Sequence, residues 1–82
     1  MNKIPRNTKP PEPFVFVYKK IASPLAKFLV RRMYDDPEGA EEVYSETVMA
    51  AWVGWQTFQN KSTYLTWIFR IALNKMADYY RD

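Results

Sequence analysis

The sequence predicts an all-α fold: one compact domain of three helices, the first interrupted at Pro24, behind a flexible Pro-rich N-terminal arm. Three observations predict it. From residue 14 onward, apolar residues recur at spacings of three and four, the periodicity of a helix that buries one face. Capping residues and Pro separate the periodic segments, and no segment alternates with the period of a strand. With 82 residues, 48% hydrophobic and 17% aromatic, the chain can build one small core.

Residues 1–13 are predicted to form the flexible basic arm. Four of the six prolines fall there, and large apolar residues are almost absent. Pro fits neither a helix interior nor a central strand, so regular structure is not expected in this segment. Residues 14–82 are then predicted to form the helical domain.

The first helix is predicted to begin at Phe14. Its first apolar stripe consists of Phe14, Val17 and Ile21. Ser23 followed by Pro24 indicates a break and a restart, because Ser caps helices and Pro fits their first turn. The apolar stripe of the restarted segment consists of Leu25, Phe28, Leu29 and Met33.

A second helix is predicted after Asp35 and Asp36, because an acidic residue can cap a helix start and Pro37 suits the first helical position. The stripe predicted to face the core consists of Ala40, Val43 or Tyr44, Thr47, Ala51, Trp55 and Phe58. Carboxylates occupy another side of this helix. Those near its start, such as Glu38, also interact favourably with the helix dipole, so part of the acidity has a structural explanation.

A third helix is predicted after the polar connection 59–63, with Ser62 or Thr63 as its cap and an end near Arg81. Its core stripe consists of Leu65, Ile68, Ile71 or Ala72, Met76 and Tyr79. Its polar second face consists of Thr66, Arg70, Asn74 and Arg81. The rings of Trp52, Trp55, Tyr64 and Trp67 lie mostly at core spacing, so we expect core packing rather than a platform for stacked bases.

Charge divides the chain into three blocks. Residues 1–34 hold eight basic side chains and one acidic, residues 35–46 hold six acidic and none basic, and residues 47–82 hold four basic and two acidic. The net charge is +3. A charged run is usually a solvated face, but neighbouring blocks of opposite sign also suit a protein with one basic and one acidic contact surface.

Two absences narrow the function classes. The chain has no Cys and no His, so it offers no disulfide, thiolate zinc site, thiol nucleophile or His-dependent catalysis. We expect neither an enzyme nor a bound metal or cofactor, since no nucleophile–base pair or metal cluster can be assembled from the remaining residue types. The longest uncharged run, residues 47–60, is shorter than the roughly 20 residues that span a bilayer. We therefore expect a soluble cytoplasmic protein without a membrane span.

Two segments carry a recognisable pattern. Residues 36–43 read Asp-Pro-Glu-Gly-Ala-Glu-Glu-Val, with an Ala-Trp pair further along the helix, and residues 66–74 read Thr-Trp-Ile-Phe-Arg-Ile-Ala-Leu-Asn, with Asp78 and Arg81 after them. Residues 14–82 thereby resemble region 2 of the sigma-70 family of bacterial transcription initiation factors, most closely the extracytoplasmic-function (ECF) group. The family signature W-[LI]-x-R-I-A-x-N-x-x-x-D-x-x-R is matched without a gap.

The resemblance implies a domain that docks on core RNA polymerase, at the clamp helices of its largest-subunit pair. It also implies capture of a flipped base of the single-stranded non-template minus-ten promoter element. In this family an anti-sigma factor can be a further partner. The residues that match the family's polymerase contacts are Glu38, Glu41, Glu42, Ser45, Glu46 and Met49. Those that match its promoter contacts are Phe58, Gln59, Asn60, Lys61, Ser62, Thr63, Tyr64, Arg70, Asn74, Lys75 and Arg81.

Within the promoter set, the residues have different implied roles. The loop before the third helix is the implied base pocket, and Asn74 can both donate to and accept from a base edge through its amide. The cations are candidates for phosphate contacts, which add affinity without reading sequence.

A few positions depart from the family pattern. Gly39 replaces a frequent acid, Glu42 a frequent Asp and Ser45 a frequent Gln, so we expect an altered polymerase contact. The pair 60–61, Asn-Lys, stands where many members have a Gly-acid pair. Because this loop sets base preference in the family, the sequence does not predict which base is recognised.

Two other functions fit the same residues. The substituted second helix suits a sigma-like interaction module that binds polymerase or an anti-sigma factor without reading DNA bases. An unrelated three-helix domain could instead read duplex DNA through the major groove. Loss of promoter opening in Asn74→Ala would separate the promoter-reading hypothesis from the first, and preference for single-stranded DNA would exclude the second.

Overall fold

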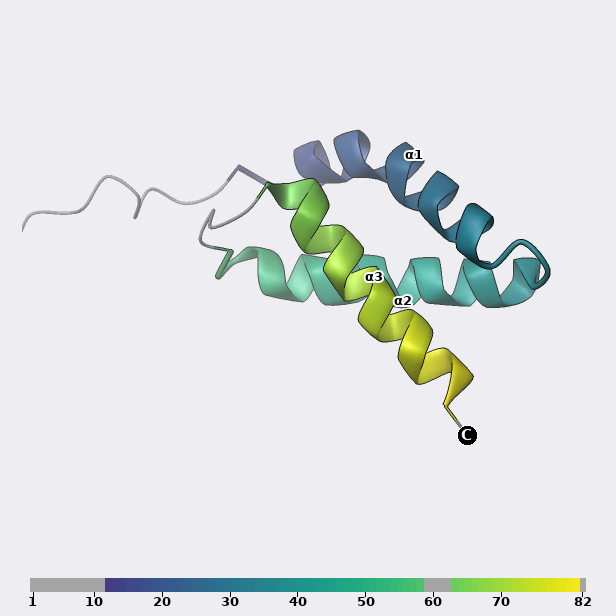
Figure 1. The fold of residues 1–82 in the computed structure, drawn as a ribbon. Helices are drawn as coiled ribbons and strands as arrows, with labels where there is room; N and C mark the ends of the chain where they lie inside the picture. Colours follow the sequence, from purple (N-terminus) through teal and green to yellow (C-terminus); the bar gives the residue numbers. More distant parts are fainter. Residues whose placement is uncertain (1–11, 59–62, 82) are drawn as a thin grey trace, which may run out of the picture.

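The computed structural model describes residues 12–58 and 63–81 and shows three helices: α1 (Phe14–Arg32), α2 (Pro37–Trp55) and α3 (Tyr64–Tyr80). These two ranges contain no strand. α1 and α2 are joined by a tight turn and run back along one another, and α3 lies across them and contacts both (Figure 1). The predicted all-α class is confirmed. Most of the predicted arm, residues 1–11, lies outside the described residues.

α1 runs through Pro24 without a break, so the interruption expected there does not occur. Pro24 cannot donate the helical hydrogen bond to the carbonyl of Lys20, and an interior Pro costs about 3 kcal/mol. Ile21 and Leu25 on either side of it are nevertheless fully buried. Burying each such side chain stabilises the fold by about 1.5–3 kcal/mol, so packing outweighs the lost bond.

α2 begins as predicted. The side chain of Asp36 accepts a hydrogen bond of 2.9 Å from the backbone N–H of Gly39, and Pro37 occupies the first turn. The buried stripe of α2 consists of Gly39, Ala40, Val43, Thr47, Ala51 and Trp55. The helix ends at Trp55, so Phe58, which was expected on the same stripe, follows the helix and packs back onto it.

α3 also begins at its predicted cap, since the hydroxyl of Thr63 accepts a 3.1 Å hydrogen bond from the backbone N–H of Thr66. Ile68 and Ala72 are fully buried, as the predicted stripe requires. Tyr79, predicted for the core, instead lies at the surface, where its hydroxyl bonds to the capping carboxylate of α2.

The core lies where the three helices meet, and its α1 contribution is a row at every fourth residue. The buried apolar side chains are Val17, Ile21, Leu25 and Leu29 of α1, Met33 directly after it, Ala40, Val43, Ala51 and Trp55 of α2, and Ile68 and Ala72 of α3. At the end of α2 an aromatic cluster forms around Trp55, whose ring centroid lies 5.0 Å from that of Phe58 and 5.8 Å from that of Trp67. This cluster fixes the end of α2 against the start of α3.

The segment before α1 is tied to the same end of the domain. The indole N–H of Trp55 donates a 2.6 Å hydrogen bond to the backbone carbonyl of Glu12. The carboxylate of Glu12 also lies 3.9 Å from the ammonium of Lys20. The chain therefore enters α1 beside the end of α2.

Candidate functional site

The outward side of α3 presents an amide and a guanidinium on successive turns. Thr66, Arg70 and Asn74 follow one another at steps of four and are all exposed, while Ile68 and Ala72 are buried on the opposite side. An amide can pair with a base edge, and a guanidinium can pair with a phosphate. This face therefore has the chemistry that nucleic-acid recognition needs.

The two other predicted cations of α3 are placed differently. Arg81 is exposed and lies 3.2 Å from the carboxylate of Asp78, an open ion pair of small energetic value. Lys75 is half-buried on the side of α3 that faces α2, where it lines a hollow with Glu42 and Glu46. The structure thus keeps Lys75 away from the outward side that carries Arg70.

The predicted promoter loop is anchored at both ends. Phe58 stacks on Trp55 and lies 4.9 Å from the ring centroid of Trp67, so its ring belongs to the aromatic cluster. Tyr64 is half-buried, with the ammonium of Lys20 5.9 Å from its ring centroid. The middle of the loop, residues 59–62, lies outside the described residues, so the predicted sites Gln59, Asn60, Lys61 and Ser62 have no structural description.

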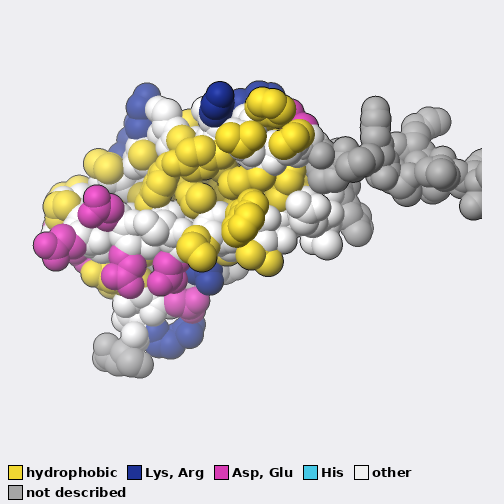
Figure 2. All heavy atoms as spheres, turned by 180° about the vertical axis from the view of Figure 1, so that it is seen from behind, with side chains coloured by type: hydrophobic (Ala, Val, Ile, Leu, Met, Phe, Trp, Pro, Cys, Tyr) yellow, Lys and Arg dark blue, Asp and Glu magenta, His cyan; other side chains and the backbone are white. Residues whose placement is uncertain are grey.

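The predicted polymerase-facing residues of α2 form an exposed ridge between two hollows. All six are exposed: Glu38, Glu41, Glu42, Ser45, Glu46 and Met49. Glu38 and Glu41 border a hollow against α1, and Glu42 and Glu46 border the hollow against α3. Figure 2 shows carboxylates gathered at one end of the face opposite α3. The structure therefore brings these six side chains together on one helix.

The comparison with family models agrees with this arrangement of the three helices. Residues 21–82 match the model described as Sigma-70 region 2. The chain belongs to the sigma-70 region 2 family. It is also similar to the RNA polymerase sigma factor CnrH of Cupriavidus metallidurans, with 39% identity over 51 residues, 61% of this chain and 27% of that protein. No solved structure matches the chain significantly.

These findings confirm the resemblance drawn from the sequence, a region 2 domain of the ECF group. The chain spans about a quarter of the length of the sigma factor it matches. The functions of its surfaces are therefore argued from its own residues below.

This region 2 domain has an apolar groove that the sequence did not predict. It consists of two neighbouring hollows, which we together call the α1–α2 groove: Ala26, Val30 and Tyr44 line one, and Tyr18, Val48 and Trp52 line the other. Figure 2 shows hydrophobic side chains gathered along this face. Trp52, expected mainly in the core, is 60% exposed, and Met49 and Val53 beside it are also exposed. The spacing of four from Tyr44 through Val48 to Trp52 was the available signal.

A tyrosine pair links the two hollows, since Tyr44 lines one and Tyr18 lines the other. The hydroxyls of Tyr18 and Tyr44 lie 2.7 Å apart and share a hydrogen bond. Burial, the hydrogen bond to Tyr18 and the charge of an ionised Tyr18 together raise the pKa of Tyr44 to about 12. The hydroxyl of Tyr44 therefore stays protonated at neutral pH and adds no charge to the groove.

The described residues hold neither a metal-binding cluster nor a membrane-spanning helix. In residues 12–58 and 63–81, no group of three or more Asp and Glu side chains is arranged to hold a metal ion. Across the same ranges, none of the helices combines the length and the hydropathy that crossing a bilayer requires.

Proposed function

We propose that this region 2 domain docks on core RNA polymerase through α2 and captures a base of the melted non-template minus-ten strand at α3. The observation that carries the proposal is the separation of two exposed faces within a sigma-70 region 2 fold. The acidic ridge lies on α2, whereas Arg70 and Asn74 lie on the outward side of α3. A partner seated on the ridge leaves the α3 face open to DNA.

The α2 ridge suits a basic partner helix. Its four glutamates attract and orient basic side chains, which speeds docking and fixes register more than it adds affinity. Met49 at the same ridge is 62% exposed and offers apolar contact area. The clamp helices of polymerase are the partner that the family resemblance implies, and the substitutions at Gly39, Glu42 and Ser45 mark where this contact differs.

On the DNA side, the energies favour a cooperative mechanism. Unstacking a base costs a few kcal/mol, and seating it in a pocket or on a ring returns about 1–3 kcal/mol. One base therefore contributes little net affinity. We expect the isolated chain to bind promoter DNA weakly and to hold the base firmly only when polymerase supplies further contacts.

The docking half of the proposal is tested by retention of the chain on immobilised core RNA polymerase at moderate salt. Glu42→Lys with Glu46→Lys should abolish retention. The matched control, Glu12→Lys with Asp35→Lys, makes the same charge change off the ridge and should retain most binding. Equal loss in both double variants would mean that net charge, rather than the ridge, controls retention.

The base-reading half is tested by binding of a labelled non-template minus-ten oligonucleotide to the complex of chain and polymerase. Asn74→Ala should weaken this binding about tenfold, as expected when a good pair of base hydrogen bonds is removed. Thr66→Ala, on the same outward side, is the control. Unchanged oligonucleotide affinity in Asn74→Ala, with polymerase retention intact, would reject base reading by this residue.

The α1–α2 groove favours a second candidate function, an interaction module that binds an amphipathic helix of polymerase or an anti-sigma factor without reading DNA. The groove has an apolar floor and carboxylates along its α2 edge, as a helix-in-groove site requires. Trp52→Ser should then weaken partner binding while oligonucleotide binding is unaffected. The reverse pattern would support the promoter-reading function.

A further inference from the structure

We propose that a basic strip along the seam of α1 and α3 holds the sugar-phosphate backbone of single-stranded DNA. This α1–α3 strip consists of Lys20, Phe28 and Arg32 of α1 and Tyr64, Phe69 and Arg70 of α3. The inference rests on the proposed function, because it extends the DNA surface of α3 onto α1. Neither Lys20 nor Arg32 belongs to the promoter set that the family resemblance supplied.

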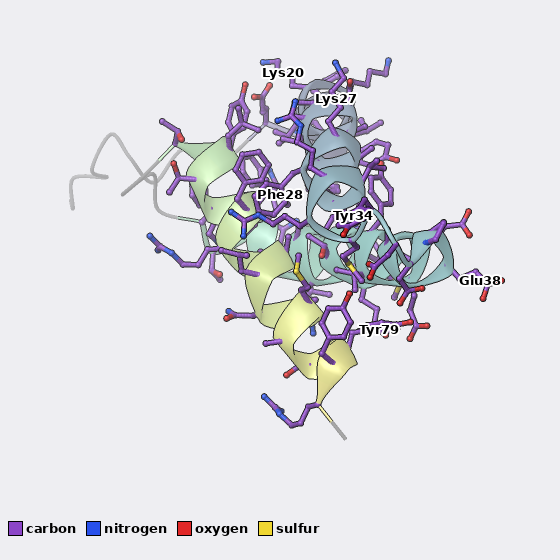
Figure 3. All side chains as sticks on the ribbon, turned by 45° about the vertical axis from the view of Figure 1, so that its right-hand side comes forward. Lys20, Lys27, Phe28, Tyr34, Glu38 and Tyr79 are labelled. Carbon is purple, nitrogen blue, oxygen red and sulfur yellow. The ribbon has the colours of Figure 1, made fainter. Side chains whose placement is uncertain are left out.

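The α1 half of the strip is one row of the helix. Lys20, Phe28 and Arg32 each directly precede a member of the buried row, which recurs at every fourth residue, so they flank that row as it winds around α1. Phe28 and Lys20 contact rings of α3, which shows that this row faces α3. Figure 3 shows Phe28 between the two helices and Lys20 further along α1.

One cation of the strip contacts a stacked pair of rings. The rings of Phe28 and Phe69 are stacked, with centroids 4.5 Å apart and planes 11° from parallel. The guanidinium carbon of Arg32 lies 4.7 Å from the Phe28 centroid. Such a cation–π contact restrains the side chain, and a restrained planar guanidinium is suited to two parallel hydrogen bonds with a phosphate. The rings are engaged with each other, so the strip offers charge rather than a stacking platform.

The strip has few internal counter-charges. Helix α1 contains Lys19, Lys20, Lys27, Arg31 and Arg32 and no carboxylate. Among residues 12–58 and 63–81, ion pairs within 4.0 Å involve only Lys20 with Glu12, both half exposed, and Arg81 with Asp78. Arg32 and Arg70 therefore have no carboxylate partner within that distance in this part of the chain. A polyanion laid along the seam would neutralise them.

The position and the length of the α1–α3 strip favour a nucleic-acid strand as the polyanion that binds there. The guanidinium of Arg32 lies over Phe28, eight residues after Lys20, which corresponds to about 12 Å along the helix, long enough to follow more than one phosphate. Arg70 directly follows Phe69 in the chain and is exposed on the outward side of α3. A strand held at Asn74 would thus reach Arg70, about one turn away on the same side of α3, and from there the strip.

The test measures binding of a fluorescent oligothymidylate to the full chain over a range of salt concentrations. Lys20→Gln with Arg32→Gln removes two cations of the strip. Lys19→Gln with Arg31→Gln, one residue away in each case, removes the same two residue types from the outer side of α1. The strip variant should lower the slope of log affinity against log salt by about 1.4, since each lost phosphate contact contributes about 0.7 for single strands. The control should change it much less.

If the slope of log affinity against log salt is the same in the two double variants, the proposed DNA contact of the strip is rejected. Circular dichroism verifies that both double variants remain helical. If the strip variant loses helicity, the single variants Lys20→Gln and Lys19→Gln are compared instead, and the slope of log affinity against log salt should differ between them by about 0.7. A polyglutamate competitor of matched charge should displace the oligonucleotide poorly. Equally effective displacement would show a surface for acidic polypeptide and overturn the nucleic-acid assignment.

The outcome is separable from that of the proposed function. Oligothymidylate carries no promoter sequence, so a failure of Asn74→Ala to affect minus-ten binding leaves the strip result standing. Conversely, normal minus-ten base reading with equal slopes for the two double variants would reject the strip alone.

Discussion

The hydroxyl of Tyr79 donates a 2.9 Å hydrogen bond to the carboxylate of Asp36, 43 residues earlier in the chain. The same carboxylate accepts the backbone N–H of Gly39 and so caps α2. The last turn of α3 is thereby joined to the first turn of α2, at the end of α3 labelled by Tyr79 in Figure 3. This bond to Asp36 is the main cause of the raised pKa of Tyr79.

Gly39→Ala should lower the free energy of unfolding by about 1 kcal/mol, because the added methyl group displaces the carboxylate of Asp36 that caps α2. A Cβ at this position would lie 2.6 Å from the hydroxyl oxygen of Tyr79 and would also crowd the Asp36 carboxylate. Chemical denaturation followed by circular dichroism measures the effect. Gly54→Ala is the control, since its Cβ would meet only the Trp67 ring, at 3.3 Å. A stabilised Gly39→Ala, the normal result of replacing Gly in a helix, would contradict the tight contact.

Alkaline pH should destabilise the fold through Tyr44. Its folded-state pKa is raised from 10.0 to about 12, so the folded state holds the phenol proton more tightly than the unfolded chain. The associated stability is complete below pH 10 and is lost as pH rises from about 10 toward 12. The free energy of unfolding, measured by denaturation at a series of pH values, should fall less steeply over this range in Tyr44→Phe. Parallel pH profiles for wild type and variant would refute this role of Tyr44.

The two tryptophans of α2 should differ sharply in their contribution to stability. Trp55→Ala should cost about 3–5 kcal/mol, because it removes a buried ring and the hydrogen bond to Glu12. Trp52→Ala should change stability by less than about 0.5 kcal/mol, since its side chain is 60% exposed. Thermal and urea unfolding of both variants provide the measurement. A large loss in Trp52→Ala would mean that the groove side chains contribute to the core.

Pro24→Ala should stabilise α1 by up to about 3 kcal/mol, because it restores a backbone hydrogen-bond donor inside a continuous helix. The neighbouring Ser23→Ala, which leaves the backbone donors unchanged, is the control. The midpoint of thermal unfolding should rise clearly in the first variant and little in the second. A lower midpoint in Pro24→Ala would show that packing of the half-buried Pro ring matters more than the missing donor.

Local and periodic features of this fold were predictable, and contacts between distant segments were not. The caps Asp36 and Thr63 act within three residues of themselves, so sequence spacing identifies them. The same holds for the exposure of the acidic ridge. The continuity of α1 at Pro24 depends instead on packing against the other helices. The Ser23-Pro24 pair carries no information about that packing, so the sequence predicted a break.

The candidate site shows the same division. The outward side of α3 follows from a repeat of four residues, and Asn74 is exposed as expected. The predicted core stripe of α2 included Trp55, which is buried, and not Trp52, which is exposed, so the expectation that the Trp52 ring packs in the core was wrong. The pairing of Phe28 with Phe69 spans 41 residues and required the crossing of α1 and α3. The α1–α3 strip, which depends on this pairing, could therefore not be predicted from the sequence.

The hydrogen bond from Trp55 to the carbonyl of Glu12 has a practical consequence for experiments on this chain. It holds the entry to α1 at the same end of the molecule as the passage from α2 to α3, while the C-terminal end of α3 points away (Figure 1). An affinity handle or dye joined ahead of Glu12 would emerge beside the end of α2 and the start of α3 and could obstruct a strand bound there. Immobilisation and labelling are best placed after Arg81, at the opposite end of α3.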